Sequence, residues 1–309
     1  MFLPKDFVET AEGYIFAVVW HGIEHGKVLC FLRYIEVEGA WIKVDTEQAN
    51  ALLREQCPGY LYYSVLLDAH LHAVVIDKIA KHYQPRECLQ QILTKNHYDD
   101  VEGDLIQLCH LLQENGVDLS QIGITGSLLI GVQKQNSDID LICYGRKTFH
   151  QCRAELAKLI SQHKLQDLTE EEWLSSYNRR SCHLSFSEYV WHERRKGNKA
   201  LIRGRKIDLS FIDDTQSVDK MRYQKCGMIT LQCLVIDDTY AFDYPAVFKV
   251  GHEDYDAIVC FTATYTGQAL TGETIEVSGN IEQTQAGLNR IVVGSSREAV
   301  GEYIKVIHV

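Results

Sequence analysis

Proline is scarce in this sequence, with four in 309 residues, and the patterns that mark several large protein classes are missing. No apolar run reaches the ~18 residues of a membrane-spanning helix. Residues 1–20 lack the basic start and apolar core of a cleavable leader. The ten cysteines are scattered without a C-x-x-C pair or zinc-finger spacing, which favours reduced thiols. The composition therefore predicts a cytoplasmic protein with no membrane segment.

Common phosphate-binding motifs are also absent. Neither G-x-x-x-x-G-K-[ST] nor G-x-G-x-x-G occurs in the chain, so phosphate binding would need other groups. The net charge of −11 argues against a general nucleic-acid coat, because such binding depends on neutralising phosphates. Residues 86–235 hold equal numbers of acidic and basic side chains, whereas both flanks are acidic. An anionic substrate would be repelled least by this middle segment.

Two of the four prolines, Pro85 and Pro245, fall where the residue pattern changes. Residues 1–84 are rich in aromatic and β-branched segments, which predicts a β-rich domain. Residues 85–235 alternate helical and strand patterns, which predicts an α/β (α+β) core with a mixed sheet. Residues 236–309 alternate apolar and polar positions between glycine-bearing turns, which predicts a small β-barrel or sandwich.

Two aspartates, Asp138 and Asp140, interrupt an apolar segment of the core. Side chains two apart share a face of a strand, so both carboxylates point away from Ile139 and Leu141. The segment "KIDLSFI" places Asp208 on the polar face of another strand in the same way. Like charges this close need a positive partner, and carboxylate oxygens suit Mg²⁺ or Mn²⁺ carrying a nucleotide's phosphates. We therefore expect a metal site at Asp138, Asp140 and Asp208.

A glycine and a serine precede these aspartates, at positions 126 and 127. Gly126 at a strand-to-helix turn would let backbone N–H groups approach a phosphate, and Ser127 would add a hydroxyl donor. The alternative for Ser127 is a helix N-cap without any ligand.

The stretch "GSLLIGVQKQNSDIDL" resembles the signature of the DNA polymerase β-like nucleotidyltransferase superfamily, in which Gly-Ser is followed by Asp-x-Asp between apolar residues. "RKIDLSFI" resembles that superfamily's third-carboxylate strand, so the resemblance covers about residues 120–215. The whole chain also resembles a family of predicted nucleotidyltransferases with an added β-rich C-terminal region. The resemblance implies that Asp138 and Asp140 bind two metal ions, that Asp208 completes the site and helps activate the attacking hydroxyl, and that Gly126 and Ser127 hold the triphosphate.

Seven cations occur between positions 194 and 206. From this basic run we expect Arg194, Lys196 and Lys199 to contact the triphosphate or a nucleic-acid backbone. The alternative is a solvated charged face without a ligand.

The sequence thus predicts an enzyme that moves a nucleoside monophosphate from ATP or another NTP to a hydroxyl, with release of pyrophosphate. The acceptor is left open among an RNA or DNA end, a small alcohol and a protein side chain. One rival is a catalytically silent module that retains the fold and binds a nucleotide, a nucleic acid or another partner. A second rival is a toxin–antitoxin component that modifies a partner protein.

Overall fold

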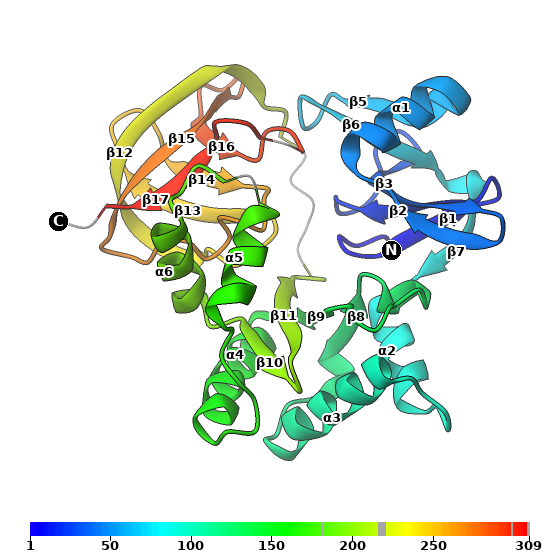
Figure 1. The fold of residues 1–309 in the computed structure, drawn as a ribbon. Coiled ribbons are helices and arrows are strands. Elements are labelled where there is room, and N and C mark those ends of the chain that lie inside the picture. The colour runs from blue at the N-terminus through cyan, green and yellow to red at the C-terminus, as the bar shows by residue number, and fades with distance from the viewer. Residues whose placement is uncertain (181, 216–220, 298, 308–309) are drawn as a thin grey trace. The chain divides into compact units, whose positions relative to one another are not determined.

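The computed structural model describes residues 1–180, 182–215, 221–297 and 299–307, and these residues form three β-sheets with helices beside them (Figure 1). The chain divides into two compact units. One unit comprises residues 1–63, 70–167 and 198–218, and the other comprises residues 64–69, 168–197 and 219–309. The three-domain division expected from the sequence stays a prediction.

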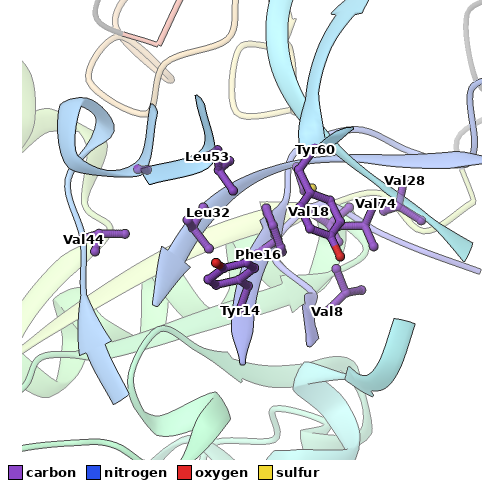
Figure 2. Packing of buried hydrophobic residues seen from close by; sticks show 12 residues of the cluster. Val8, Tyr14, Phe16, Val18, Val28, Leu32, Val44, Leu53, Tyr60 and Val74 are labelled. Carbon is purple, nitrogen blue, oxygen red and sulfur yellow. The ribbon is translucent and has the colours of Figure 1, made fainter. Parts of the chain in front are cut away.

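The first unit begins with a seven-stranded sheet in the order β5-β6-β3-β2-β1-β7, with β4 paired to β3. Its strands are β1 (Phe7–Thr10), β2 (Tyr14–Val18), β3 (Lys27–Val37), β4 (Ala40–Lys43), β5 (Leu61–Ser64), β6 (Ala69–Val75) and β7 (Ile79–Tyr83). Alternate side chains of β2 and β3, among them Phe16 and Leu32, are fully buried in one core (Figure 2). Burial of one face in this way is what holds an antiparallel sheet in register.

Helix α1 (Thr46–Gln56) lies within this β-rich segment, at residues for which the sequence analysis predicted no particular element. Asp45 accepts a hydrogen bond from the Gln48 backbone, and the Gln48 side chain bonds back to the Asp45 N–H. This reciprocal cap fixes the helix start. Ala49 and Leu53 then pack into the core of the sheet.

The second sheet has the order β10-β11-β9-β8 and confirms the mixed α/β core expected from the sequence. Its strands are β8 (Ile122–Thr125), β9 (Ile139–Tyr144), β10 (Lys199–Ile202) and β11 (Arg205–Ile212). Strand β9 runs parallel to β11 and antiparallel to β8.

Three helices of the first unit accompany this sheet: α2 (Pro85–Leu93), α3 (Asp100–Glu114) and α4 (Arg146–Ser161). Helix α4 packs on β11, with the Phe149 and Phe211 ring centroids 5.8 Å apart. Helix α2 packs against β8 so closely that a Cβ atom on Gly123 would lie 2.7 Å from Pro85 Cβ. A glycine at this position therefore sets the distance between helix and strand.

The second unit contains a ring of strand pairings, in which β12 pairs with β13, β13 with β14, β14 with β16, β16 with β15, and β15 with β12. Its strands are β12 (Gln224–Tyr240), β13 (Ala246–Gly251), β14 (Ala257–Cys260), β15 (Thr274–Gln283), β16 (Asn289–Val293) and β17 (Tyr303–Val306). Strand β17 adds to β15, and helices α5 (Glu170–Asn178) and α6 (Phe186–Lys196) belong to the same unit.

Candidate active site

The two strands β9 and β11 bring the predicted aspartates together. Asp140 and Asp208 are register partners on these parallel strands, and neighbouring strands lie roughly 5 Å apart. Asp138 stands directly before β9. The apolar residues next to these aspartates on each strand, such as Ile139 and Leu209, are almost fully buried. The alternation expected from the sequence therefore holds, and the polar face carries the carboxylates.

Gly126 closes the end of β8 beside Asp140. Its φ of +72° is in the left-handed region, and a Cβ atom there would lie 2.6 Å from Asp140 Oδ2. Only glycine combines this backbone conformation with so close a carboxylate. Ser127 follows with helical backbone angles but makes no side-chain cap hydrogen bond, so the N-cap alternative for its hydroxyl has no support in the structure.

The helix expected after Ser127 is shorter than predicted. It is a single 3-10 turn, Leu128–Ile130, which ends at Gly131 with φ +70°. A left-handed glycine is a common way to end a helix, and here it stops the helix after one turn.

Burial and two neighbouring carboxylates disfavour the ionised form of Asp140. Burial, and after it the negative charges of Asp208 and Asp138, raise the pKa of Asp140 to about 6. The ammonium groups of Lys5 and Lys206 act in the opposite direction. A partly buried group of oxygen ligands with excess negative charge fits a hard divalent cation.

Two lysines contact these carboxylates. Lys206 Nζ lies 2.5 Å from Asp138 Oδ2, and Lys199 Nζ lies 3.5 Å from Asp208 Oδ2. Asn198 Nδ2 also donates to Asp208 Oδ1 at 3.3 Å. In the described part of the chain, no three His, Cys, Asp or Glu side chains gather into a ready cage for a metal ion. The three carboxylates are therefore the kind of ligand that a divalent metal ion prefers, and in this structure lysines contact two of them, Asp138 and Asp208.

The basic run is dispersed over different environments. Lys199, at the start of β10, is the member of the predicted phosphate-binding set that contacts a site carboxylate. Arg194 and Lys196 are in the last turn of α6, in the second unit. Lys196 is 2% exposed, and its ammonium lies 2.5 Å from Glu193 Oε1 and 2.7 Å from the Thr264 carbonyl. These two partners hold the buried ammonium of Lys196 within the second unit, and its contact with phosphate stays a prediction.

Arg205, from the same run, fixes the loop before Asp138. Its guanidinium donates to Asp104 Oδ2 at 2.8 Å and to the carbonyls of Gln135 and Ser137 at 2.7 and 2.8 Å. Because five donors in one plane can satisfy several acceptors, a single arginine holds the approach to Asp138 in place. Sequence reasoning missed this role, since a salt bridge between positions 104 and 205 leaves no local pattern.

Comparisons with known proteins identify the family to which the segment with this site belongs. The family model described as "Nucleotidyltransferase domain" matches residues 107–222. This segment belongs to the DNA polymerase β-like nucleotidyltransferase superfamily, as the Gly-Ser and Asp-x-Asp motifs within it indicated. It is similar to "Uncharacterized protein MJ1086" of Methanocaldococcus jannaschii, with 32% identity over 343 aligned positions that cover 98% of each chain. The chain and this protein therefore share one family along their whole length.

No solved structure matches the chain. Within the described residues, no helix is both long enough and apolar enough to cross a membrane.

Proposed function

We propose that this protein transfers a nucleoside monophosphate from an NTP to a hydroxyl acceptor and releases pyrophosphate, in a reaction that depends on Mg²⁺ or Mn²⁺. The observation that carries the proposal is the placement of three carboxylates on the polar face of β9 and β11, directly beside the Gly126 turn. The superfamily assignment supports nucleotidyl transfer in general.

Asp138, Asp140 and Asp208 would hold the divalent ions. Bound there, such ions neutralise the carboxylates and the phosphate oxygens and stabilise the entering and leaving oxygens. Lys206 and Lys199 would then exchange their carboxylate partners for phosphate oxygens, because an ammonium suits either anion. The lysine contacts are, in this view, the resting arrangement of the site.

The chain's own groups have separate tasks in the reaction. The Gly126 and Ser127 turn binds the triphosphate through backbone N–H groups and the hydroxyl. The acceptor oxygen forms a bond to the α-phosphorus while the bond from that phosphorus to the β-phosphate oxygen breaks. The acceptor proton passes to the Asp208 carboxylate, and pyrophosphate leaves. Positioning and charge stabilisation would supply most of the rate.

The acceptor stays open among a nucleic-acid end, a small alcohol and a protein hydroxyl. Both flanks of the chain are acidic, which disfavours a tight grip on a nucleic-acid backbone. A small or protein-borne acceptor therefore has the better electrostatic fit.

One observation favours a second candidate function. Lys206 forms an ion pair with Asp138, and among the described residues no three His, Cys, Asp or Glu side chains are grouped so that they could hold a metal ion. A module that binds a nucleotide or nucleic acid without turnover would need no metal ion, because Lys206 and Lys199 already neutralise two carboxylates on this face of the sheet.

A labelling experiment tests the proposal. ATP, GTP, CTP and UTP labelled at the α-phosphate are supplied with Mg²⁺ or Mn²⁺ to cellular RNA, cellular protein and a small-molecule extract. We expect label in one fraction, and a loss of about 10²–10³-fold in the Asp140→Asn variant, since one group that stabilises transition-state charge contributes this much.

The matched control is Asp77→Asn, which makes the same change at an exposed aspartate of the first unit and should keep full transfer. Transfer that survives in Asp140→Asn would contradict the site. Absence of label in every fraction, together with normal NTP binding, would establish the silent module.

A further inference from the structure

The residues before β1 form a turn that is tied down at several points. Leu3 N–H donates to Asp6 Oδ2 at 3.0 Å, and Lys5 N–H donates to the Val18 carbonyl at 3.0 Å. Asp6 is 2% exposed, and its carboxylate lies 2.8 Å from His82 Nε2. This turn is therefore an ordered part of the first unit.

Lys5 has an unusual backbone conformation within that turn. Its φ is +76°, in the left-handed region that favours glycine. A side chain there costs about 1–2 kcal/mol relative to an ordinary conformation. Strained residues of this kind persist where the surroundings hold them, and they gather at functional sites. The strained backbone of Lys5 is therefore a reason to look for a function of its side chain.

A hydrogen bond places Lys5 beside the candidate active site. Thr125 Oγ1 donates to the Lys5 carbonyl at 2.9 Å. Thr125 is the register partner of Asp140 across β8 and β9, and it immediately precedes Gly126. Lys5 thus belongs to the rim of the turn that we assign to the triphosphate.

A second contact supports this placement. Phe7, Ile15 and Tyr34 of the N-terminal sheet pack with Leu129, which lies in the 3-10 turn after Ser127. Two independent contacts, one polar and one apolar, therefore join the N-terminal sheet to the phosphate-binding turn.

We propose that Lys5 is a further phosphate-binding residue of the NTP site, whose ammonium contacts the β- and γ-phosphate oxygens of a triphosphate held at Gly126 and Ser127. The inference rests on the proposed function and extends it beyond the matched family segment, residues 107–222. An ammonium on the rim of the turn adds a charge-assisted hydrogen bond to phosphate. The same contact would stabilise the pyrophosphate as it leaves.

The informative variant is Lys5→Gly. Glycine accepts the positive φ of this position, so the variant removes the ammonium while it relieves strain, and it should fold. Lys5→Arg keeps the positive charge and serves as the rescue variant. Two controls lie away from the site: Glu38→Gly relieves a positive φ of 51°, and Lys164→Ala removes an exposed cation.

The measurement is equilibrium binding of ATP, AMP and inorganic pyrophosphate in the presence of Mg²⁺, followed by kcat and KM for transfer. We expect Lys5→Gly to weaken ATP and pyrophosphate binding about 10- to 100-fold, as loss of a charged hydrogen bond implies. AMP binding should change less than 2-fold, and Lys5→Arg should recover most of the loss.

Other outcomes overturn the inference in distinguishable ways. Equal losses for ATP and AMP would assign Lys5 a structural role. If Lys5→Gly binds ATP and pyrophosphate and transfers the nucleotide as the wild-type protein does, Lys5 is not a phosphate-binding residue, and the proposed function still stands. A wild-type protein that binds neither ATP nor pyrophosphate would end both proposals.

Discussion

At the scale of single residues, the candidate site is a balance of like and unlike charges. Asp140 carries the cost of burial beside two other carboxylates, which raises its pKa to about 6. Lys206 and Lys199 contact the two neighbours of Asp140 in the site, Asp138 and Asp208. The sequence identified the three aspartates because alternation along a strand is visible locally. It could not show which cations would reach them, because that depends on tertiary placement.

The raised pKa of Asp140 predicts a pH-dependent effect of Asp140→Asn on metal-free protein. The ordinary pKa is 3.8 and the folded value is about 6, so the folded state is protonated below about pH 5, whereas the unfolded state takes up the proton only as the pH falls through 3.8. Above pH 6 the folded state holds an ionised carboxylate that it disfavours. The variant should gain about 1–3 kcal/mol in free energy of unfolding at pH 8, and almost nothing at pH 3.5.

Urea unfolding in EDTA across this pH range measures the difference. The exposed Asp77→Asn variant should show no such trend. A wild-type protein that is more stable than Asp140→Asn at pH 8 would contradict the charge balance described for the site.

At the scale of elements, local signals predicted much of the core. The change of pattern noted at Pro85 coincides with the start of helix α2 (Pro85–Leu93), because proline suits a first helical turn. The strands around Asp140 and Asp208 were predicted from their alternation and are confirmed. Helix α1 was missed although its cap residues, Asp45 and Gln48, are a readable signal. The expected boundary between residues 235 and 236 falls inside the long strand β12 (Gln224–Tyr240), whose continuity depends on partners distant in sequence.

The connection from β8 to the 3-10 turn yields a prediction with an internal control. Gly126 and Gly131 have similar φ values, +72° and +70°, but a Cβ atom would meet Asp140 Oδ2 at 2.6 Å in the first and nothing within 4 Å in the second. Both alanine variants should lose about 1–2 kcal/mol of stability from backbone strain. Gly126→Ala should in addition weaken Mg²⁺·NTP binding at least 10-fold, because it displaces the Asp140 carboxylate.

Denaturant unfolding and nucleotide titration of the two variants separate these effects. Equal nucleotide affinities in Gly126→Ala and Gly131→Ala would show that the turn does not position Asp140 for binding.

At the scale of the whole molecule, the chain shares one family with the Methanocaldococcus jannaschii protein over 98% of both lengths. The nucleotidyltransferase match, residues 107–222, runs through sequence of both compact units. The N-terminal sheet belongs to the same unit as the carboxylates and contacts the turn beside them. Sequence patterns could not predict this contribution, since Lys5 and Thr125 are far apart along the chain and belong to no common motif.

We propose above all that Asp138, Asp140 and Asp208 form a metal–nucleotide site. The most direct test is the anomalous scattering of Mn²⁺ in crystals grown with an NTP analogue that cannot be cleaved at the α-phosphate. We expect manganese within roughly 2–2.3 Å of oxygens from these aspartates, triphosphate at the Gly126 turn, and Lys206 moved from Asp138 to phosphate. Nucleotide bound without manganese at these aspartates, with Lys206 still on Asp138, would contradict it.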